Sequence, residues 1–329
     1  MPLVRNVIVN ALIVVASASL SVIACEVGLR LLYPHGALGS GEELEFLRRE
    51  PSARWMSNAM MPDEAIGFRP KLNVEGGYDK DGLRHRSHAG QSDIRRRILF
   101  LGDSVTARGR IVRAIEKDLH DPTTEFLNGG VEAFNLTQEV SFFLRFQSAL
   151  TVDRIVHQVH GNDLRATPIA FRDENGTLNA FLLNSPRQHV DQWLFQHSYL
   201  YRIGLAVFLS HKTEADTLQE ARENFARMAA FAAERGIEYD VVLFPILLSQ
   251  DALYRDDRRD WLALEKACRE VVQKCVSLLP VLDHMLKQGQ PVEEIAGDTW
   301  HPNDAFAAAA APVIIKALGL EAQPAPKTW

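Results

Sequence analysis

The chain contains few cysteines and lacks the short motifs that mark several common enzyme classes. It has 3 cysteines among 329 residues, which is not the pattern of a disulfide-stapled scaffold. No glycine-rich phosphate loop, no Gly-x-Ser-x-Gly motif and no spaced group of His, Cys and Asp residues occurs. These absences argue against a nucleotide site, a nucleophile-elbow hydrolase and a bound metal, and we expect no cofactor.

Two of the cysteines lie close together in the sequence. Cys268 and Cys275 are seven residues apart in a segment whose apolar residues have helical spacing. A helix rises about 1.5 Å per residue, so these residues would be about 10 Å apart, too far for a disulfide within one helix. We therefore predict that both are buried thiols. Cys25 belongs to an N-terminal apolar run, and the cysteines alone do not indicate a compartment.

The chain has no excess of positive charge. Lys and Arg number 36 and Asp and Glu 42, which gives a net charge of −6, and no basic stripe is present. We therefore expect no nucleic-acid partner. The proportions of apolar residues (47%) and charged residues (24%) are ordinary for a globular protein, and the length suits one large domain or two small ones. Nothing in the sequence indicates an oligomeric state.

The N-terminus carries an apolar run without charge. Residues 7–25 contain no charged side chain, and about 20 mostly apolar residues are needed to span a bilayer. We favour an uncleaved signal anchor over residues 1–33. Two alternatives are a lipoprotein signal, because small residues directly precede Cys25, and a buried helix of a soluble domain. Arg5 before the run and Arg30 after it favour a cytoplasmic N-terminus, with the body of the chain on the periplasmic, extracytoplasmic side of the cytoplasmic membrane.

The body of the chain alternates strands with amphipathic helices. Residues 34–96 are charged and rich in turns, and we expect a stalk followed by a cap. Residues 97–320 hold the alternation, and residues 321–329 form an expected flexible tail. The alternation predicts a three-layer α/β/α domain with a mainly parallel five-stranded sheet. The expected strands are 97–103, 124–130, 153–163, 238–247 and 276–283, and the expected helices include 111–119, 135–150, 218–232 and 261–275.

Polar residues follow three of the predicted strands. These strands end in Gly102-Asp103-Ser104, Asn128-Gly129-Gly130 and Gly161-Asn162-Asp163, and an Asp-x-x-His segment at 298–301 precedes the last helix. Because the carboxyl ends of parallel strands meet at one edge of a sheet, we expect these groups to lie together. Acyl transfer needs this set, namely a nucleophile, a base, a group that orients the base, and donors for an oxyanion.

Four segments, taken in order, resemble the blocks of the SGNH (GDSL-type) hydrolases. They are "GDSV" (102–105), "NGGVEAFNLTQE" (128–139), "GND" (161–163) and "DTWHP" (298–302). Their order and spacing agree with the family over residues 97–320. The N-terminal apolar helix and a "GFRP" segment resemble the membrane-anchored bacterial type of this family.

The resemblance implies a flavodoxin-like SGNH hydrolase fold and a role for each matched residue. Ser104 would be the nucleophile, His301 the base, and Asp298 the group that orients His301. The backbone amides of Ser104 and Gly130 and the side chain of Asn162 would form the oxyanion hole.

The chain departs from the family pattern in two places and carries one long insertion. Ala133 stands where the family often has a glycine. Arg108 and Arg110 follow the nucleophile block, and we expect them either to bind a substrate anion or to face solvent. The aromatic-rich insertion at 164–210 follows an active-site strand and is a candidate lid. We favour a satellite hydrophobic core for these residues, and the alternatives are an acyl-chain pocket and a membrane-facing surface.

Together these features predict a membrane-anchored serine esterase or acylhydrolase. It would cleave an O-acyl ester on a cell-envelope glycan or lipid through an acyl-serine intermediate. One alternative uses the same residues as an O-acetyltransferase for an exported polysaccharide. Another is a non-catalytic envelope binding protein that retains the site by descent. The sequence does not distinguish water from a sugar hydroxyl as the acyl acceptor, and it does not indicate the acyl length.

Overall fold

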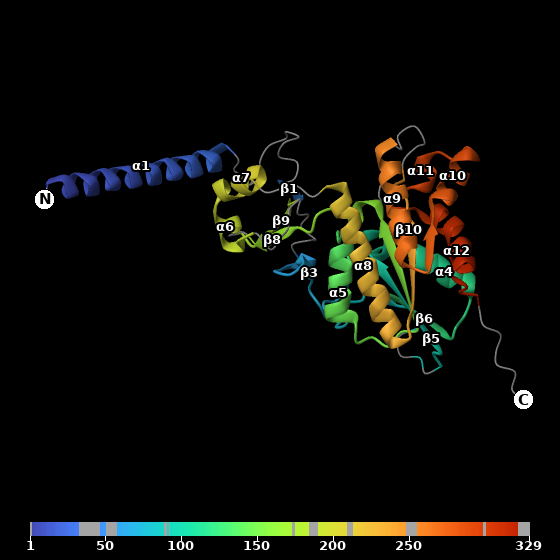
Figure 1. Cartoon of the computed structure of the whole chain (residues 1–329). Coiled ribbons are helices and arrows are strands. Elements are labelled where there is room, and N and C mark those ends of the chain that lie inside the picture. The colour runs from blue at the N-terminus through green and yellow to red at the C-terminus, as the bar shows by residue number, and fades with distance from the viewer. Residues whose placement is uncertain are drawn as a thin grey trace, which may run out of the picture. The chain divides into compact units, whose positions relative to one another are not determined.

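The computed structural model of the chain describes residues 2–32, 47–50, 58–88, 91, 93–172, 175–183, 190–208, 213–247, 255–298 and 301–321. Most of the predicted stalk before residue 58, and the predicted tail after Glu321, lie outside the described residues. The chain divides into two compact units (Figure 1). Unit 1 comprises residues 1–58, 62–68 and 166–212, and unit 2 comprises residues 59–61, 69–165 and 213–329.

A six-stranded sheet forms the centre of unit 2. Its strand order is β11-β10-β7-β5-β6-β4, and neighbours are parallel except β4, which is antiparallel to β6. The predicted five parallel strands are confirmed, in the order of flavodoxin-like sheets, and β4 is an additional edge strand. The bounds are β4 His85–Arg86, β5 Arg96–Gly102, β6 Thr124–Asn128, β7 Arg154–His160, β10 Glu238–Phe244 and β11 Lys274–Ser277.

Helices cover both faces of this sheet, which confirms the three-layer prediction (Figure 1). On one face α4 packs against α12, and on the other α8 packs against both α5 and α9. The bounds of these helices are α4 Arg110–Leu119, α5 Leu136–Phe142, α8 Glu214–Arg235, α9 Arg255–Val271 and α12 Asp304–Leu318. Further helices are α3 Ser104–Ala107, η2 Phe143–Gln147, η3 Gly161–Leu164, α10 Leu279–Lys287 and α11 Val292–Ile295.

Capping residues set where these helices begin and end. A capping box begins α5, because the Asn135 side chain accepts from the Gln138 N–H and the Gln138 side chain accepts from the Asn135 N–H. Helix α8 ends at Gly236, whose φ of 67° lies in the left-handed region that favours glycine. The helix predicted over 135–150 changes after α5 into the π-helical turn η2.

The chain after α9 departs from the prediction. The apolar stripe predicts one helix as far as Cys275, but α9 ends at Val271 and Cys275 lies in β11. This turn brings the Cα atoms of Cys268 and Cys275 to 6.2 Å, and the two residues form a disulfide. The prediction of two free thiols is therefore wrong, because the helix ends before the second cysteine. The fifth strand also lies earlier than 276–283, since α10 already begins at Leu279.

Unit 1 joins the N-terminal extension to the insertion after β7. Its antiparallel sheet has the order β1-β9-β8, so a strand of the extension pairs with a strand of the insertion. Buried Phe181 and Phe195 belong to a separate small core, and Arg202 Cζ lies 4.8 Å from the Phe181 ring centroid. The bounds are β1 Leu47–Glu50, β8 Ile169–Arg172, β9 Leu178–Leu183, α6 Gln192–His197 and α7 Tyr199–Phe208. Two further strands, β2 Met60–Asp63 and β3 Gly67–Pro70, form a separate hairpin.

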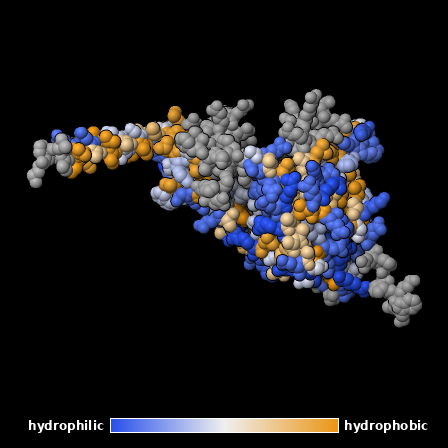
Figure 2. Space-filling model, viewed as in Figure 1, coloured by the Kyte–Doolittle hydropathy of each residue, from blue (hydrophilic) through white to orange (hydrophobic). Residues whose placement is uncertain are grey.

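Helix α1, Pro2–Leu32, is long and apolar enough over 6–32 to cross a membrane. Its apolar side chains are exposed, as the orange surface in Figure 2 shows, so the alternative of a buried helix is wrong. Within unit 1, the C-terminal end of α1 is hydrogen-bonded to the start of α7. There the Glu26 carboxylate accepts hydrogen bonds from the N–H groups of Tyr199 and Leu200, both at 3.0 Å, and so caps the start of α7.

Replacing Cys268 and Cys275 by alanine together should lower the free energy of unfolding by about 2.5 kcal/mol, because the disulfide limits the freedom of the unfolded chain. Thermal unfolding of the detergent-solubilised full chain measures the effect. Cys25→Ala is the matched control, since Cys25 is free and exposed, and it should leave the transition unchanged. Finding three titratable thiols in the unreduced, denatured chain would contradict the disulfide.

Candidate active site

Ser104 begins the short helix α3 directly after the central strand β5. Asp103 caps this helix, because its Oδ1 accepts a hydrogen bond from the Val105 N–H at 2.8 Å. Gly102, with φ 149°, has no space for a side chain, since a Cβ there would lie 2.3 Å from Thr106 Oγ1. The glycine therefore permits the sharp passage from strand to helix, and this passage leaves Ser104 at the carboxyl edge of the sheet.

The imidazole of His301 joins Ser104 to Asp298. Its Nε2 lies 2.8 Å from Ser104 Oγ, and its Nδ1 lies 2.7 Å from Asp298 Oδ1. The Nδ1–H donates to the carboxylate, so Nε2 is the acceptor that faces the Ser104 hydroxyl. The structure thus brings together the three predicted residues, although Ser104 and His301 are 197 residues apart in the sequence.

Local contacts hold the segment that carries Asp298 and His301. The His301 N–H donates to Asp298 Oδ1 at 3.0 Å, and the Gly297 N–H donates to the His301 carbonyl at 2.8 Å. Arg110 fixes the next residue, because its Nη1 donates to the Pro302 carbonyl at 2.6 Å. The sequence suggested that Arg110 contacts a substrate anion or solvent, but the structure uses its guanidinium to position this segment.

Arg108, the other predicted substrate ligand, lies at the end of α3. Its side chain is 40% exposed, and its Nη1 lies 3.4 Å from Asp298 Oδ2. Burial lowers the pKa of His301 below its usual value, and the positive charge of Arg108 adds to this effect, while the hydrogen bond to Asp298 opposes it. The lowered pKa keeps the imidazole neutral at pH 7, the state in which it can accept a proton.

Two of the three predicted oxyanion donors are available, and the third is not. The Ser104 N–H and the Asn162 Nδ2 group have no hydrogen-bond partner among the described residues. Asn162 Oδ1 is hydrogen-bonded to His160 Nδ1, which fixes the orientation of the carboxamide. The Gly130 N–H donates to Asn128 Oδ1 at 3.0 Å. This bond contradicts the expectation that Gly130 supplies an oxyanion donor.

Gly130 has a steric function instead. A Cβ on Gly130 would lie 2.4 Å from the Ala107 nitrogen and 2.7 Å from the Thr106 carbonyl carbon. Asn128 stabilises the same contact, because its Nδ2 donates to the Thr106 carbonyl at 2.8 Å. The end of β6 therefore packs directly against the backbone of α3, the helix that begins with Ser104.

Ala133, in the same loop, offers an alternative candidate for the third donor. Its φ of 62° lies in the left-handed region that favours glycine, the residue that the resemblance expects at this position. Its N–H has no hydrogen-bond partner within the part of the chain that the structure describes. The departure at Ala133 was visible in the sequence, but the sequence alone assigned the donor to Gly130.

A buried polar group in the core of unit 2 was not predicted. Glu139 Oε2 lies 2.8 Å from His157 Nε2, and Tyr239 Oη lies 3.0 Å from His157 Nδ1. Burial raises the pKa of Glu139 and lowers the pKa of His157 to about 3, and both shifts favour the neutral forms of the two side chains. The hydrogen bonds to His157 give the buried carboxyl and the buried phenol a polar partner.

No family model and no curated protein matches the chain, but solved structures do. The α/β hydrolase LAE5 from the metagenome of Lake Arreo, Spain, is 12% identical with a TM-score of 0.46, covering 70% of this chain and 98% of that one. The acetylxylan esterase Axe2 of Geobacillus stearothermophilus is 14% identical with a TM-score of 0.46, covering 69% and 96%. A lipolytic G-D-S-L family protein of Veillonella parvula is 14% identical with a TM-score of 0.40, covering 67% and 97%.

If His301 acts as the base, kcat/KM should fall as the pH drops through the pKa of His301, because the protonated imidazole cannot accept the Ser104 proton. The lowered pKa places the midpoint of this acid limb below 6.5. Arg108→Gln removes a positive charge near His301 and should move the midpoint to higher pH. Hydrolysis of p-nitrophenyl acetate between pH 4 and 8 measures both. Arg95→Gln, an exposed arginine outside the site, is the control, and a midpoint unmoved in Arg108→Gln would contradict this account.

Gly130→Ala should lower the free energy of unfolding by about 1–3 kcal/mol, because the new methyl group overlaps the backbone of α3. Ala133→Gly is a matched change in the same loop. A residue other than glycine in the left-handed region costs about 1 kcal/mol, and the change to glycine removes this cost. Ala133→Gly should therefore not destabilise the chain. Thermal unfolding of both variants tests the assignment, and a Gly130→Ala chain as stable as wild type would disprove the close contact.

Proposed function

We propose that the chain is a serine esterase that cleaves an O-acyl ester through an acyl-Ser104 intermediate. The observation that carries the proposal is the continuous set of hydrogen bonds from Ser104 Oγ to His301 and from His301 to Asp298, at 2.8 and 2.7 Å. A hydroxyl hydrogen-bonded to a neutral imidazole that is itself oriented by a carboxylate is the arrangement that activates a serine for attack.

The reaction would proceed in two half-reactions. His301 Nε2 accepts the proton from Ser104 Oγ as this oxygen attacks the acyl carbonyl carbon. The tetrahedral intermediate then collapses, the proton passes from Nε2 to the leaving alcohol oxygen, and the acyl group remains on Ser104. Water next gives a proton to Nε2 and attacks the acyl carbonyl, which releases the carboxylic acid and restores the Ser104 hydroxyl. Asp298 stabilises the imidazolium in both halves.

Three donors would stabilise the negative oxygen of the tetrahedral intermediates. We assign them to the Ser104 N–H, the Asn162 Nδ2 group and the Ala133 N–H, because each lacks a hydrogen-bond partner among the described residues. Ala133 replaces Gly130, whose N–H is already bonded to Asn128. Loss of one donor of this kind costs on the order of 3 kcal/mol of transition-state stabilisation.

Two features support a place outside the cytoplasm. Helix α1 is long and apolar enough to span a membrane, and the Cys268–Cys275 disulfide is typical of an oxidising compartment. We propose a single-pass anchor with unit 2 on the periplasmic side, where the acyl groups of envelope glycans or lipids would be substrates. Attachment of a lipid to the exposed Cys25 is the alternative form of anchoring.

The nucleophile can be tested on the full chain in detergent. Ser104→Ala should lower kcat/KM for p-nitrophenyl acetate at least about a thousandfold, because the acyl group has no oxygen to which it can transfer. Ser141→Ala, in α5, is the control and should retain the wild-type rate. A Ser104→Ala chain that hydrolyses this ester at the wild-type rate would disprove the proposal.

Trapping the acyl-enzyme distinguishes the alternatives. Rapid acid quenching and peptide mass analysis should find one acetyl group on the peptide that contains Ser104. Discharge by water supports the esterase, whereas discharge that depends on an added glycan supports an O-acetyltransferase with the same residues. A chain that never becomes acylated would be a binding protein without this catalytic activity.

A further inference from the structure

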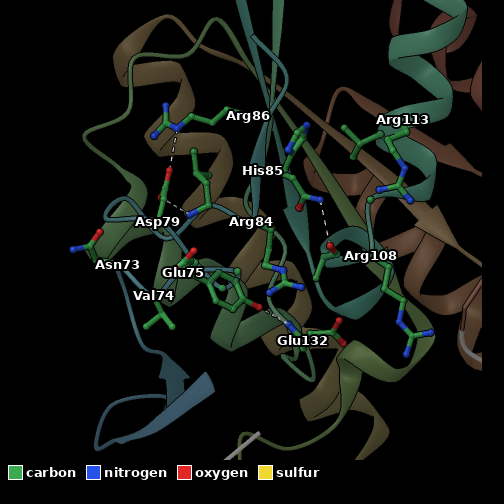
Figure 3. A pocket seen from close by; sticks show the side chains of 18 residues that line it. Asn73, Val74, Glu75, Asp79, Arg84, His85, Arg86, Arg108, Arg113 and Glu132 are labelled. Atoms are coloured by element: carbon green, nitrogen blue, oxygen red, sulfur yellow. Dashed lines mark hydrogen bonds and ion pairs between the residues drawn. The ribbon is translucent and has the colours of Figure 1, made fainter. Parts of the chain in front are cut away.

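A cavity of about 870 Å³ lies beside the proposed catalytic residues in unit 2 (Figure 3). Its wall is formed by the turn at 73–79, the residues around β4, residues 107–113 from the end of α3 to the first turn of α4, and the loop after β6. The volume falls within the range of about 300–1,000 Å³ that is typical of ligand sites. The esterase proposal does not account for this cavity, since neither Ser104 nor His301 lines it.

Four arginines line the cavity, and one of them is neutralised within its wall. Arg86 forms ion pairs with Asp79 at 3.0 Å and with Asp81 at 2.6 Å (the Asp79 pair is drawn in Figure 3). Asp79 in addition accepts hydrogen bonds from the Asp81 and Leu83 N–H groups, both at 2.9 Å. Arg86 therefore stabilises this turn of the wall and contributes little net charge.

The other three arginines come from separate elements and keep exposed side chains. Arg84 precedes β4, Arg108 follows α3, and Arg113 lies in α4. Arg113 forms no ion pair among the described residues, and the Arg84 guanidinium lies over the Tyr78 ring, 5.1 Å from its centroid. Such stacking orients the guanidinium while its N–H donors remain available.

The opposing negative charge in the wall is smaller. Besides Asp79, the acidic lining residues are the exposed Glu75 and the half-buried Glu132. Burial raises the pKa of Glu132, although the charges of Arg108 and Arg84 oppose this shift. Four guanidinium groups and three carboxyl groups thus line the cavity. Arg86 and Arg108 are paired in addition with Asp81 and Asp298, which lie outside the lining, so the positive charge open to a ligand is that of Arg84 and Arg113, which form no ion pair among the described residues.

We propose that this arginine-lined cavity binds the carboxylate groups of an acidic glycan whose acyl ester is placed at Ser104. Guanidinium groups bind carboxylates through paired, charge-assisted hydrogen bonds. Charged side chains outnumber aliphatic ones in the wall, which disfavours a lipid acyl chain as the occupant. The inference rests on the proposed esterase function for the role of Ser104, but the binding itself does not require turnover.

Arg108 connects the cavity to the proposed catalytic residues. It lines the cavity and also lies 3.4 Å from Asp298, the partner of His301. Glu132 lines the cavity one residue before Ala133, the proposed oxyanion donor. A sugar carboxylate held by these arginines would therefore be bound next to the reacting ester, as a neighbouring sugar unit of the same polymer would be.

Binding can be measured on the full-length Ser104→Ala chain in detergent, with oligogalacturonate as the probe and isothermal titration calorimetry as the measurement. We expect oligogalacturonate to bind and an uncharged xylo-oligosaccharide of equal length to bind at least about tenfold more weakly. Affinity should fall as the salt concentration rises, because exposed charges are screened. Sodium acetate, a free carboxylate, should compete only at much higher concentration.

Arg113→Gln and Arg84→Gln in this background should each raise the Kd for oligogalacturonate about fivefold or more, since each removes a charge-assisted hydrogen bond. Arg113→Lys keeps the charge without the paired donors and should fall between these values. Arg95→Gln, an exposed arginine outside the cavity, is the control for a general loss of positive charge, and should leave the Kd unchanged. Circular dichroism melts confirm that each variant is folded.

Three outcomes would overturn the inference. They are equal affinity for the charged and uncharged glycans, an effect of Arg95→Gln as large as that of Arg113→Gln, and arginine-dependent binding of short-chain phosphatidylglycerol in place of oligogalacturonate. The esterase proposal is tested separately by wild-type hydrolysis of p-nitrophenyl acetate. Binding without hydrolysis would therefore disprove the esterase and retain the cavity, and hydrolysis without binding would do the reverse.

Discussion

The position of Ser104 depends on a contact between two backbones that leaves no room for a Cβ. Gly130, after β6, lies against the Thr106–Ala107 backbone of α3, and Gly102 closes the other side of the same turn. Asn128 bonds to both partners of the contact, through the Thr106 carbonyl and the Gly130 N–H. Because β5 and β6 are neighbouring parallel strands in fixed register, the sheet itself determines where α3 begins. An added methyl group in this close-packed interior would displace the backbone of α3, so this contact also fixes the position of Ser104.

A different set of contacts brings the imidazole of His301 to Ser104. Asp298 and His301 lie three residues apart, so their hydrogen bond needs only one local turn. Bringing that turn to Ser104 requires the tertiary fold, and α4 with α12 provides it. These two helices pack together on one face of the sheet, and Arg110 at the start of α4 donates to the carbonyl of Pro302, just before α12. Ser104 precedes α4 and His301 precedes α12, so the two residues are held together at the same end of this helix–helix contact.

The sequence predicted the parts of the fold that depend on local pattern. Apolar runs identified the strands, and the motifs pointed to Asn162 and to Ser104, Asp298 and His301, the three side chains that the structure joins by hydrogen bonds. It failed where a contact depends on distant chain. The disulfide was missed because the apolar residues keep their helical spacing beyond Val271, where α9 ends. The pairing of β1 with β9 joins two segments that are far apart in the sequence, and no sequence pattern links them. Gly130 was assigned as a donor from the family resemblance of its motif, which does not show that the folded loop bonds the Gly130 N–H to the Asn128 side chain.

Arg108 lies between the proposed base and the cavity, since it lines the cavity and is paired with Asp298, the partner of His301. Together with burial, its positive charge lowers the pKa of His301, which favours the neutral imidazole but weakens it as a base. A carboxylate bound to Arg108 would offset part of this charge, so the pKa of His301 would rise toward its usual value in the complex. The imidazole would then accept the Ser104 proton more readily when an acidic glycan is present than when it is absent. Brønsted behaviour makes this change favourable to catalysis as long as His301 remains mostly neutral at the working pH. An acidic substrate would thus strengthen the proposed base, through the guanidinium of Arg108, which lines the cavity and is paired with Asp298.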